Sequence, residues 1–152
     1  MTYYDEIANG YDELHKEEQL KKLKIIKDNL EINKFDKLLD VGCGTGFSLD
    51  YFDCNCIGID PSKMSKDSRI IKGKAESLPF KDNEFDIVIS VTAIHNFDDI
   101  EQGLKEMKRV GKDKFAFSVL KKSKSFNKIK KLIYNLFKIK KEIEEEKDVI
   151  FL

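Results

Sequence analysis

The sequence predicts an α/β fold in which helices cover both faces of a doubly wound, mostly parallel sheet. Short, nearly continuous apolar runs alternate with amphipathic segments, a pattern typical of strands buried on both sides. The first apolar run ends in a glycine-rich turn, as expected where a strand passes into a helix beside a ligand. With 152 residues we expect one domain over 1–152, comprising an N-terminal helical lid (1–34), a ligand-binding core (35–120), and a basic helix with a final strand (121–152).

Each element follows from local periodicity. The first 28 or so residues carry leucines and isoleucines at helical spacing, and helices are also predicted over 98–110 and 124–141. The apolar runs predict strands over 37–41, 56–60, 69–71, 85–91, 115–120 and 149–152. In such a sheet, ligands bind outside the carboxyl ends of the strands, where the strand order reverses.

Charge excludes a globally basic nucleic-acid binder, because 28 basic and 28 acidic residues cancel. Only Arg69 and Arg109 are arginines, so the chain is poorly equipped for bidentate phosphate recognition. Nine lysines lie within 121–141. We favour a sheet-covering helix with solvated lysines there over contact with RNA or an anionic membrane. The acidic run 142–146 is expected to be solvated.

The expected compartment is the cytoplasm. No stretch approaches the ~18 apolar residues of a membrane helix, and the first residues lack the basic and apolar regions of a signal peptide. The three cysteines are interpreted as thiols. Cys54 and Cys56 lack further ligands at zinc spacing, so no metal is expected, and Cys43 is interpreted as a small loop residue.

The glycine-rich turn spans 40–46 and has the spacing G-x-G-x-G. Phe47 stands where a dinucleotide fingerprint has its third glycine, which counts against NAD and FAD. No Gly-Lys-Ser/Thr follows, so a Walker loop is excluded. Asp60 ends the second strand, where a carboxylate can accept both hydroxyls of a ribose.

Five blocks in register, 38–46, 58–64, 75–80, 83–90 and 94–97, carry a family resemblance over roughly residues 35–120. They resemble the class I S-adenosylmethionine-dependent methyltransferases, especially the small-molecule branch that includes ubiquinone- and menaquinone-biosynthesis enzymes. The resemblance implies an enzyme with a Rossmann-like fold that uses S-adenosylmethionine, releases S-adenosylhomocysteine, and methylates a small-molecule acceptor.

The same resemblance implies site residues by position. Gly42, Gly44 and Gly46 would wrap the methionine end of the cofactor, Asp40 would organise its ammonium, and Asp60 would hold the ribose. The other implied contacts are Cys43 within the loop, Pro61 and Met64 beside adenine, Ala75 and Glu76 at its edge, Ser90 and Val91 at the methyl donor, and the lid residue Tyr11, with Tyr3 as a candidate to join it.

Three departures from the family pattern stand out. Lys74 occupies a place that often carries an acid for the adenine amino group. Residues 111–114 replace the usual turn before the fifth strand and are interpreted as a shortened loop. After 152 residues one final strand is available where the family has two, so we expect the last antiparallel strand to be missing. The open edge would favour a homodimer or another partner.

Methyl transfer from a sulfonium needs alignment more than covalent chemistry, and a base only when the acceptor must lose a proton. His95 is the candidate for a base or a substrate-orienting group, although we favour a structural histidine at a helix start. His15 is expected to be exposed to solvent. The fourth strand ends Ser90-Val91-Thr92-Ala93, unlike enzymes that methylate exocyclic amines of bases.

The sequence therefore predicts a methyltransferase that acts on a small molecule by in-line displacement. Two alternatives remain open: a degenerate or partner-dependent cofactor-binding subunit, and an RNA methyltransferase that uses the helix 124–141.

Overall fold

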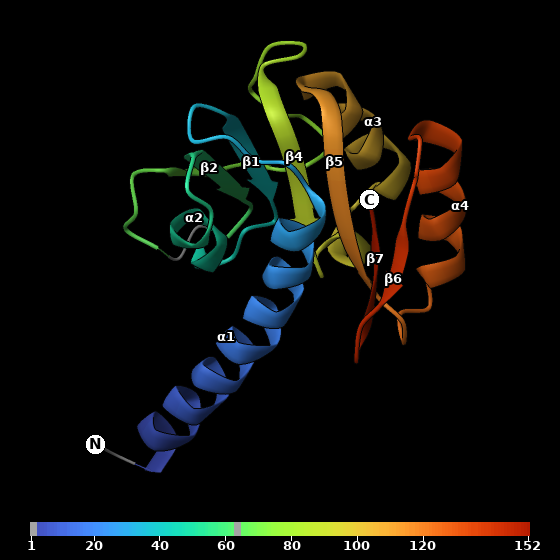
Figure 1. Ribbon diagram of the computed structural model, residues 1–152. Helices are drawn as coiled ribbons and strands as arrows, with labels where there is room; N and C mark the ends of the chain where they lie inside the picture. The colour runs from blue at the N-terminus through green and yellow to red at the C-terminus, as the bar shows by residue number, and fades with distance from the viewer. Residues whose placement is uncertain (1–2, 63–64) are drawn as a thin grey trace.

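The arrangement of helices and strands is seen in a computed structural model that describes residues 3–62 and 65–152, with side chains described from Glu13 onward (Figure 1). The elements in chain order are α1 (Tyr3–Asn29), β1 (Lys37–Val41), α2 (Phe47–Tyr51), β2 (Asn55–Asp60), β3 (Ile70–Lys72), β4 (Phe85–Val91), the 3₁₀ helix η1 (Ile94–Asn96), α3 (Ile100–Val110), β5 (Gly111–Leu120), α4 (Phe126–Leu136), β6 (Glu142–Glu144) and β7 (Asp148–Phe151).

The strands form one seven-stranded sheet in the order β3-β2-β1-β4-β5-β7-β6. The pairs β3-β2, β2-β1, β1-β4 and β4-β5 are parallel, and only β7 runs against its neighbours. The predicted doubly wound, mostly parallel sheet is confirmed. Its strand order reverses between β1 and β4, so the carboxyl ends of β1, β2 and β4 lie together.

The prediction of a missing antiparallel strand is wrong. The final strand, β7, inserts antiparallel between β5 and β6, and β6 comes from the acidic run that was expected to be solvated. β6 is an edge strand of only three residues. Its Ile143 packs on the core, while Glu142 and Glu144 stay exposed to solvent. With the strand present, the argument that a missing strand opens the sheet to a partner no longer holds.

Two other boundaries differ from the sequence prediction. Residues 111–114 are the start of β5 and not a loop, and a Cβ on Gly111 would stand 2.6 Å from the Phe115 ring that packs across it. Helix α4 ends at Leu136 instead of 141. The segment beyond it pairs with the end of β7, where Lys140 N and Lys141 N donate to Leu152 O.

Helices cover both faces of the sheet. On one face α1 and α2 bury Leu23, Ile26 and Leu49, and on the other α3 and α4 bury Leu104 and Ile133 (Figure 1). The interpretation of the lysine-rich segment as a covering helix is confirmed for 126–136. Within the described residues, no helix is long and apolar enough to cross a bilayer. The first turns of α1 extend beyond the sheet, away from the remaining helices (Figure 1).

Candidate functional site

The glycine turn after β1 folds back on the end of β2. Gly42 N and Cys43 N both donate to Ile59 O, at 2.8 and 3.2 Å. Gly42 and Gly44 have φ angles of 78° and 57°, the left-handed region that glycine adopts without steric cost. A Cβ on Gly42 would lie 2.6 Å from Ala93 Cβ, so the turn and the end of β4 touch through this glycine. Around Gly44 a Cβ would meet nothing within 4 Å, which leaves the backbone accessible to a ligand.

Asp40 supplies a buried carboxylate just before this turn. Its Oδ2 accepts a hydrogen bond from Ser48 Oγ, whereas its Oδ1 is buried and has no hydrogen-bond partner among the described residues. Burial raises the pKa of Asp40 to about 7, against the lowering effect of the Ser48 hydrogen bond, and the nearby charge of Asp60 adds to the increase. A cationic donor at Oδ1 would satisfy this oxygen and favour its charged form.

Asp60 holds a second carboxylate at the end of β2. Its Oδ2 accepts from Gly44 N at 3.0 Å, and its Oδ1 accepts from Ser62 N and Ser62 Oγ at 2.9 and 2.6 Å. These contacts orient the carboxylate and fix Asp60 beside the glycine turn.

Two adjoining cavities lie over these groups and share Gly42, Pro61, Asn96 and Phe97. The larger, about 310 Å³, is lined by Asp40, Gly44 and Asp60 from the strand ends and by His15, Gln19 and Leu23 from α1. The smaller, about 130 Å³, is lined by residues 73–76 and by Asp98. The site is therefore a cleft at the carboxyl ends of β1, β2 and β4, with α1 as one wall.

Most residues implied by the sequence come together here. The larger cavity is lined by Asp40, Gly42, Cys43, Gly44, Asp60, Pro61 and Val91, and the smaller by Gly42, Pro61, Ala75 and Glu76. The side chain of Tyr11 and the whole of Met64 fall outside the described residues, as does the side chain of Tyr3.

Three implied residues do not line either cavity. Gly46 precedes α2, where a Cβ would lie 2.9 Å from Ile70 Cδ1. Ser90 is fully buried and donates to Val41 O at 2.8 Å, which ties β4 to β1. His95 lies in η1 with its Nδ1 buried and without a hydrogen-bond partner among the described residues, whereas its neighbour Asn96 lines both cavities.

The sequence predicted a helical lid over 1–34, but it did not single out the α1 residues that line the cleft. His15 is exposed as expected, yet it lines the larger cavity together with Gln19 and Leu23. The signal was the i, i+4, i+8 spacing of these residues, which places them along one side of a helix. Gln19 Oε1 is buried and lacks a hydrogen-bond partner among the described residues.

Lys74 is paired at the rim of the smaller cavity. Its Nζ lies 2.9 Å from Asp98 Oδ2, and this hydrogen bond raises the pKa of Lys74. Lys74 stands where the family often has an acid for the adenine amino group, and Asp98 places an acid beside it at the same cavity. The Glu76 carboxylate accepts from Asp99 N at 2.8 Å, so it anchors the start of α3 from the same rim.

A family model described as a methyltransferase domain matches residues 39–117, just over half of the chain. The chain belongs to this family. An uncharacterized protein of Methanocaldococcus jannaschii is 34% identical over 145 residues, covering 90% of this chain and 56% of that protein. The demethylmenaquinone methyltransferase of Staphylococcus carnosus is 28% identical over 128 residues, covering 70% of this chain and 53% of that enzyme. The methyltransferase domain thus spans about half the length of these curated relatives.

The fold is shared with solved methyltransferase structures. A SAM-dependent methyltransferase from Thermotoga maritima superposes with a TM-score of 0.66 at 21% identity, and the match covers 97% of this chain and 96% of that one. The resemblance to class I S-adenosylmethionine-dependent methyltransferases inferred from the sequence is confirmed.

The cysteines of the methyltransferase domain are buried or half-buried thiols. Burial raises the pKa of Cys43, of Cys54 and of Cys56, the last to about 12, so all three stay protonated near neutral pH. Cys43 Sγ would lie 2.5 Å from a Cβ on Gly58, so the thiol fills the space between the turn and β2. No group of three or more metal-ligating side chains occurs within the described part of the chain.

A cavity of about 600 Å³ lies at the opposite end of the strands, between the start of β5, the segment after α4 and the end of α1. Three of the lysines that line it have partners: Lys114 Nζ donates to Glu31 O, Lys141 Nζ to Asn29 Oδ1, and Lys112 Nζ to Asp86 Oδ1. Since parallel sheets bind ligands at their carboxyl ends, the cleft beside Asp40 and Asp60 remains the candidate site.

Proposed function

We propose that the chain is an S-adenosylmethionine-dependent methyltransferase that transfers a methyl group to a small-molecule acceptor. The observation that carries this proposal is the buried, unpartnered Oδ1 of Asp40, a residue that lines the larger cavity beside a glycine turn and a second carboxylate. S-adenosylmethionine carries an ammonium, a ribose and an adenine, and the cleft offers groups suited to each.

The residues present fit the cofactor without rearrangement of the sheet. In this proposal Asp40 accepts the ammonium and Asp60 accepts the ribose hydroxyls, while the backbone of 42–44 lies along the methionine end. Adenine occupies the smaller cavity between Pro61 and residues 75–76, with Asp98 at its rim. This support comes from the lining residues and from the buried Oδ1 of Asp40, which has no hydrogen-bond partner among the described residues.

S-adenosylmethionine supplies both the methyl group and its leaving group, so the chain's own contribution is alignment and exclusion of water. Val91, Leu23 and Phe97 give the cleft apolar walls, and His15, Gln19 and Thr92 add polar groups near the acceptor's entry. His95 has no direct route to the cavity, so no base role is assigned to it. If the acceptor must lose a proton, His15 is the histidine that lines the cleft.

The acceptor class rests on the cleft and on relatives. The larger cavity measures about 310 Å³, and the Staphylococcus carnosus relative is named for demethylmenaquinone. That compound therefore comes first in a panel of acceptors.

Cofactor binding is the first test. Thermal unfolding and calorimetry are measured with S-adenosylhomocysteine, S-adenosylmethionine and, as a control, NAD. Ligand at about 100 times its dissociation constant should add ~2.7 kcal/mol of stability for the first two and none for NAD. Absence of binding by the first two would contradict the proposal.

Turnover separates the alternatives. Methylation of a panel member supports the enzyme, whereas cofactor binding without turnover on any acceptor supports a partner-dependent subunit. Methylation of RNA with an affinity that falls steeply with salt would support the RNA alternative.

A further inference from the structure

A charged pair that the proposed chemistry does not use is buried beside the cleft. Lys22 of α1 and Asp148 at the start of β7 are 3% and 0% exposed, and Lys22 Nζ lies 3.3 Å from Asp148 Oδ1. The pair joins the helix at the beginning of the described chain to the strand at its end.

Two hydroxyls complete this network. Thr92 Oγ1 donates to Asp148 Oδ2 at 2.6 Å and accepts from Lys22 Nζ at 2.9 Å, and Ser118 Oγ donates to the same Oδ2 at 2.7 Å. Thr92 immediately follows β4 and lines the larger cavity. Its φ of 54° is uncommon for a β-branched residue, so its backbone is held in place by its surroundings.

Stability alone does not account for such a pair. Burying two charges carries a desolvation cost that apolar side chains of similar size would avoid, whereas directional hydrogen bonds define one arrangement of the parts they join. The neighbouring pairs of α1, Lys21–Glu146 and Glu18–Lys147, are far more exposed and constrain the helix less. Lys22 therefore fixes the rotation of α1 about its own axis, so that Leu23, Gln19 and His15 line the cleft.

We propose that Lys22 and Asp148 are positioning residues of the methyl-transfer site, which seat α1 and Thr92 at the carboxyl end of β4 so that the helix closes the cleft. The inference rests on the proposed function and deepens it. It assigns to β7, the last strand of the described chain, a direct part in shaping the site.

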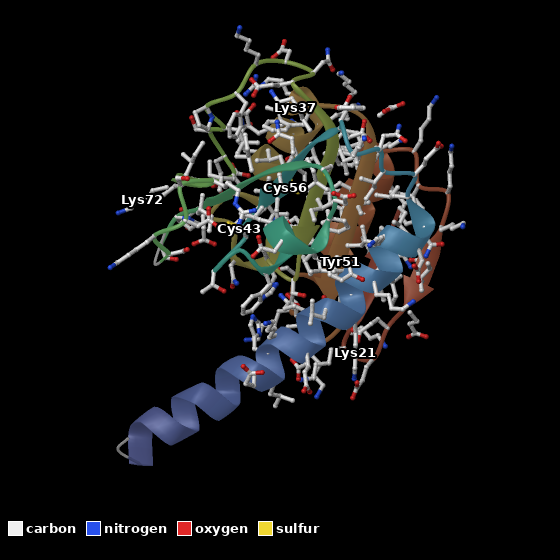
Figure 2. All side chains as sticks on the ribbon, turned by 60° about the vertical axis from the view of Figure 1, so that its left-hand side comes forward. Lys21, Lys37, Cys43, Tyr51, Cys56 and Lys72 are labelled. Atoms are coloured by element: carbon white, nitrogen blue, oxygen red, sulfur yellow. The ribbon has the colours of Figure 1, made fainter. Side chains whose placement is uncertain are left out.

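The test uses the full chain with Lys22→Met and Asp148→Asn combined. This double variant removes both charges, avoids an uncompensated buried charge, and keeps an amide oxygen for the two hydroxyls. The control is Lys21→Met, which removes the adjacent exposed lysine, labelled in Figure 2 on the part of α1 beside the body of the molecule. Hydrogen exchange along 13–29 and calorimetric titration with S-adenosylhomocysteine are measured on each.

We expect the double variant to exchange at least tenfold faster along α1, with β1, β4 and β5 unchanged, and to bind S-adenosylhomocysteine at least fivefold more weakly. The control should match the original chain in both. Unchanged exchange, or faster exchange with unchanged affinity, would overturn the proposal. Failure of the original chain to bind S-adenosylhomocysteine would instead overturn the proposed function, while the exchange measurement would still decide whether the pair seats α1.

A second comparison covers the case in which the double variant does not fold. Thr92→Ser keeps the hydroxyl that links Lys22 to Asp148, and Thr92→Val removes it with little change in size. Affinity for S-adenosylhomocysteine should be retained in the first and fall at least fivefold in the second. Equal affinities in the two variants would overturn the proposal.

Discussion

The carboxylate of Asp40 has one satisfied oxygen and one without a partner, and it titrates near pH 7 because it is buried. An unfolded aspartate loses its proton near pH ~3.9, so between these pH values the folded chain binds more protons than the unfolded chain. The raised pKa therefore makes the free energy of unfolding fall as pH rises through this window.

This titration predicts how affinity depends on pH. An ammonium at Oδ1 favours the carboxylate, so binding below about pH 7 must release the proton of Asp40. Affinity for S-adenosylhomocysteine should rise by up to ~10-fold per pH unit toward pH 7 and level off above it. Asp40→Asn should bind weakly with a flat profile. Calorimetry from pH 5.5 to 8 checks this, and a flat profile in the original chain would contradict it.

Asp60 differs from Asp40 because its carboxylate accepts from the glycine turn in addition to the ribose hydroxyls that we propose it holds. Asp60→Ala removes the acceptor of Gly44 N and should weaken binding of S-adenosylhomocysteine by about 1.5–3 kcal/mol, as expected for hydrogen bonds to a charged group. Asp53→Ala, which changes an exposed aspartate before β2, is the control. Calorimetric affinity equal to that of the control would contradict the placement of the ribose.

Motif residues were predictable where they end a strand, as Asp60 does, or directly follow one, as Gly42 does. Ser90 and Val91 could not both face the cleft, because successive residues of a strand point to opposite faces. Val91 lines the cavity and Ser90 bonds to Val41 O. His15 was predicted to be exposed. Its helical spacing with Gln19 and Leu23 places the three on one side of α1, but nothing in the sequence shows that this side faces the cleft.

At the scale of elements, Arg109 fixes the loop between β3 and β4 onto α3. Its guanidinium donates to Phe80 O and Leu78 O at 2.9 and 3.0 Å and pairs with Asp82 and Glu106. A lysine cannot reproduce this planar set of donors. The same loop contains residues 75–76, so the clamp also supports one rim of the smaller cavity.

Arg109→Lys should therefore lower the free energy of unfolding by about 1–3 kcal/mol, since two carbonyls lose a donor. Lys108→Ala, an exposed change in the same turn of α3, should have little effect. Urea unfolding of both variants measures the difference. A change no larger than in the control would show that the loop does not depend on the clamp.

The strands β1 to β4 were predictable to within one or two residues, because their apolar runs are continuous and end in glycine, proline or charged residues. The start of β5 is polar, and Lys112 and Asp113 are exposed on the sheet, so hydrophobicity gave no signal there. β6 has a single partly buried residue, Ile143, between two glutamates. Its strand conformation depends on pairing with β7, which local sequence does not encode.

For the molecule as a whole, β6 is one sheet edge, and it is protected by charge. Glu142 pairs with Lys130 at 3.0 Å and Glu144 with Lys121 at 3.4 Å. Charged side chains on an edge strand discourage pairing with another sheet.

Replacing Glu142 and Glu144 together by valine should therefore increase self-association relative to the original chain. The matched control replaces the exposed Glu17 and Glu31, which lie outside any strand, by valine. Sedimentation over a concentration series measures the association of both. Equal association of the two double variants would show that charge at this edge has no protective role.

The placement of Asp148 has a consequence for how the chain acquires its site. Thr92 depends on a carboxylate 56 residues further along, and β7 must insert between β5 and β6 before that contact forms. Such distant pairings form slowly compared with local turns. The glycine turn and its two aspartates can assemble with β1 and β2 alone, but a closed cleft requires the last strand. Ligand-binding competence should therefore appear late in refolding, after most of the helical signal has returned.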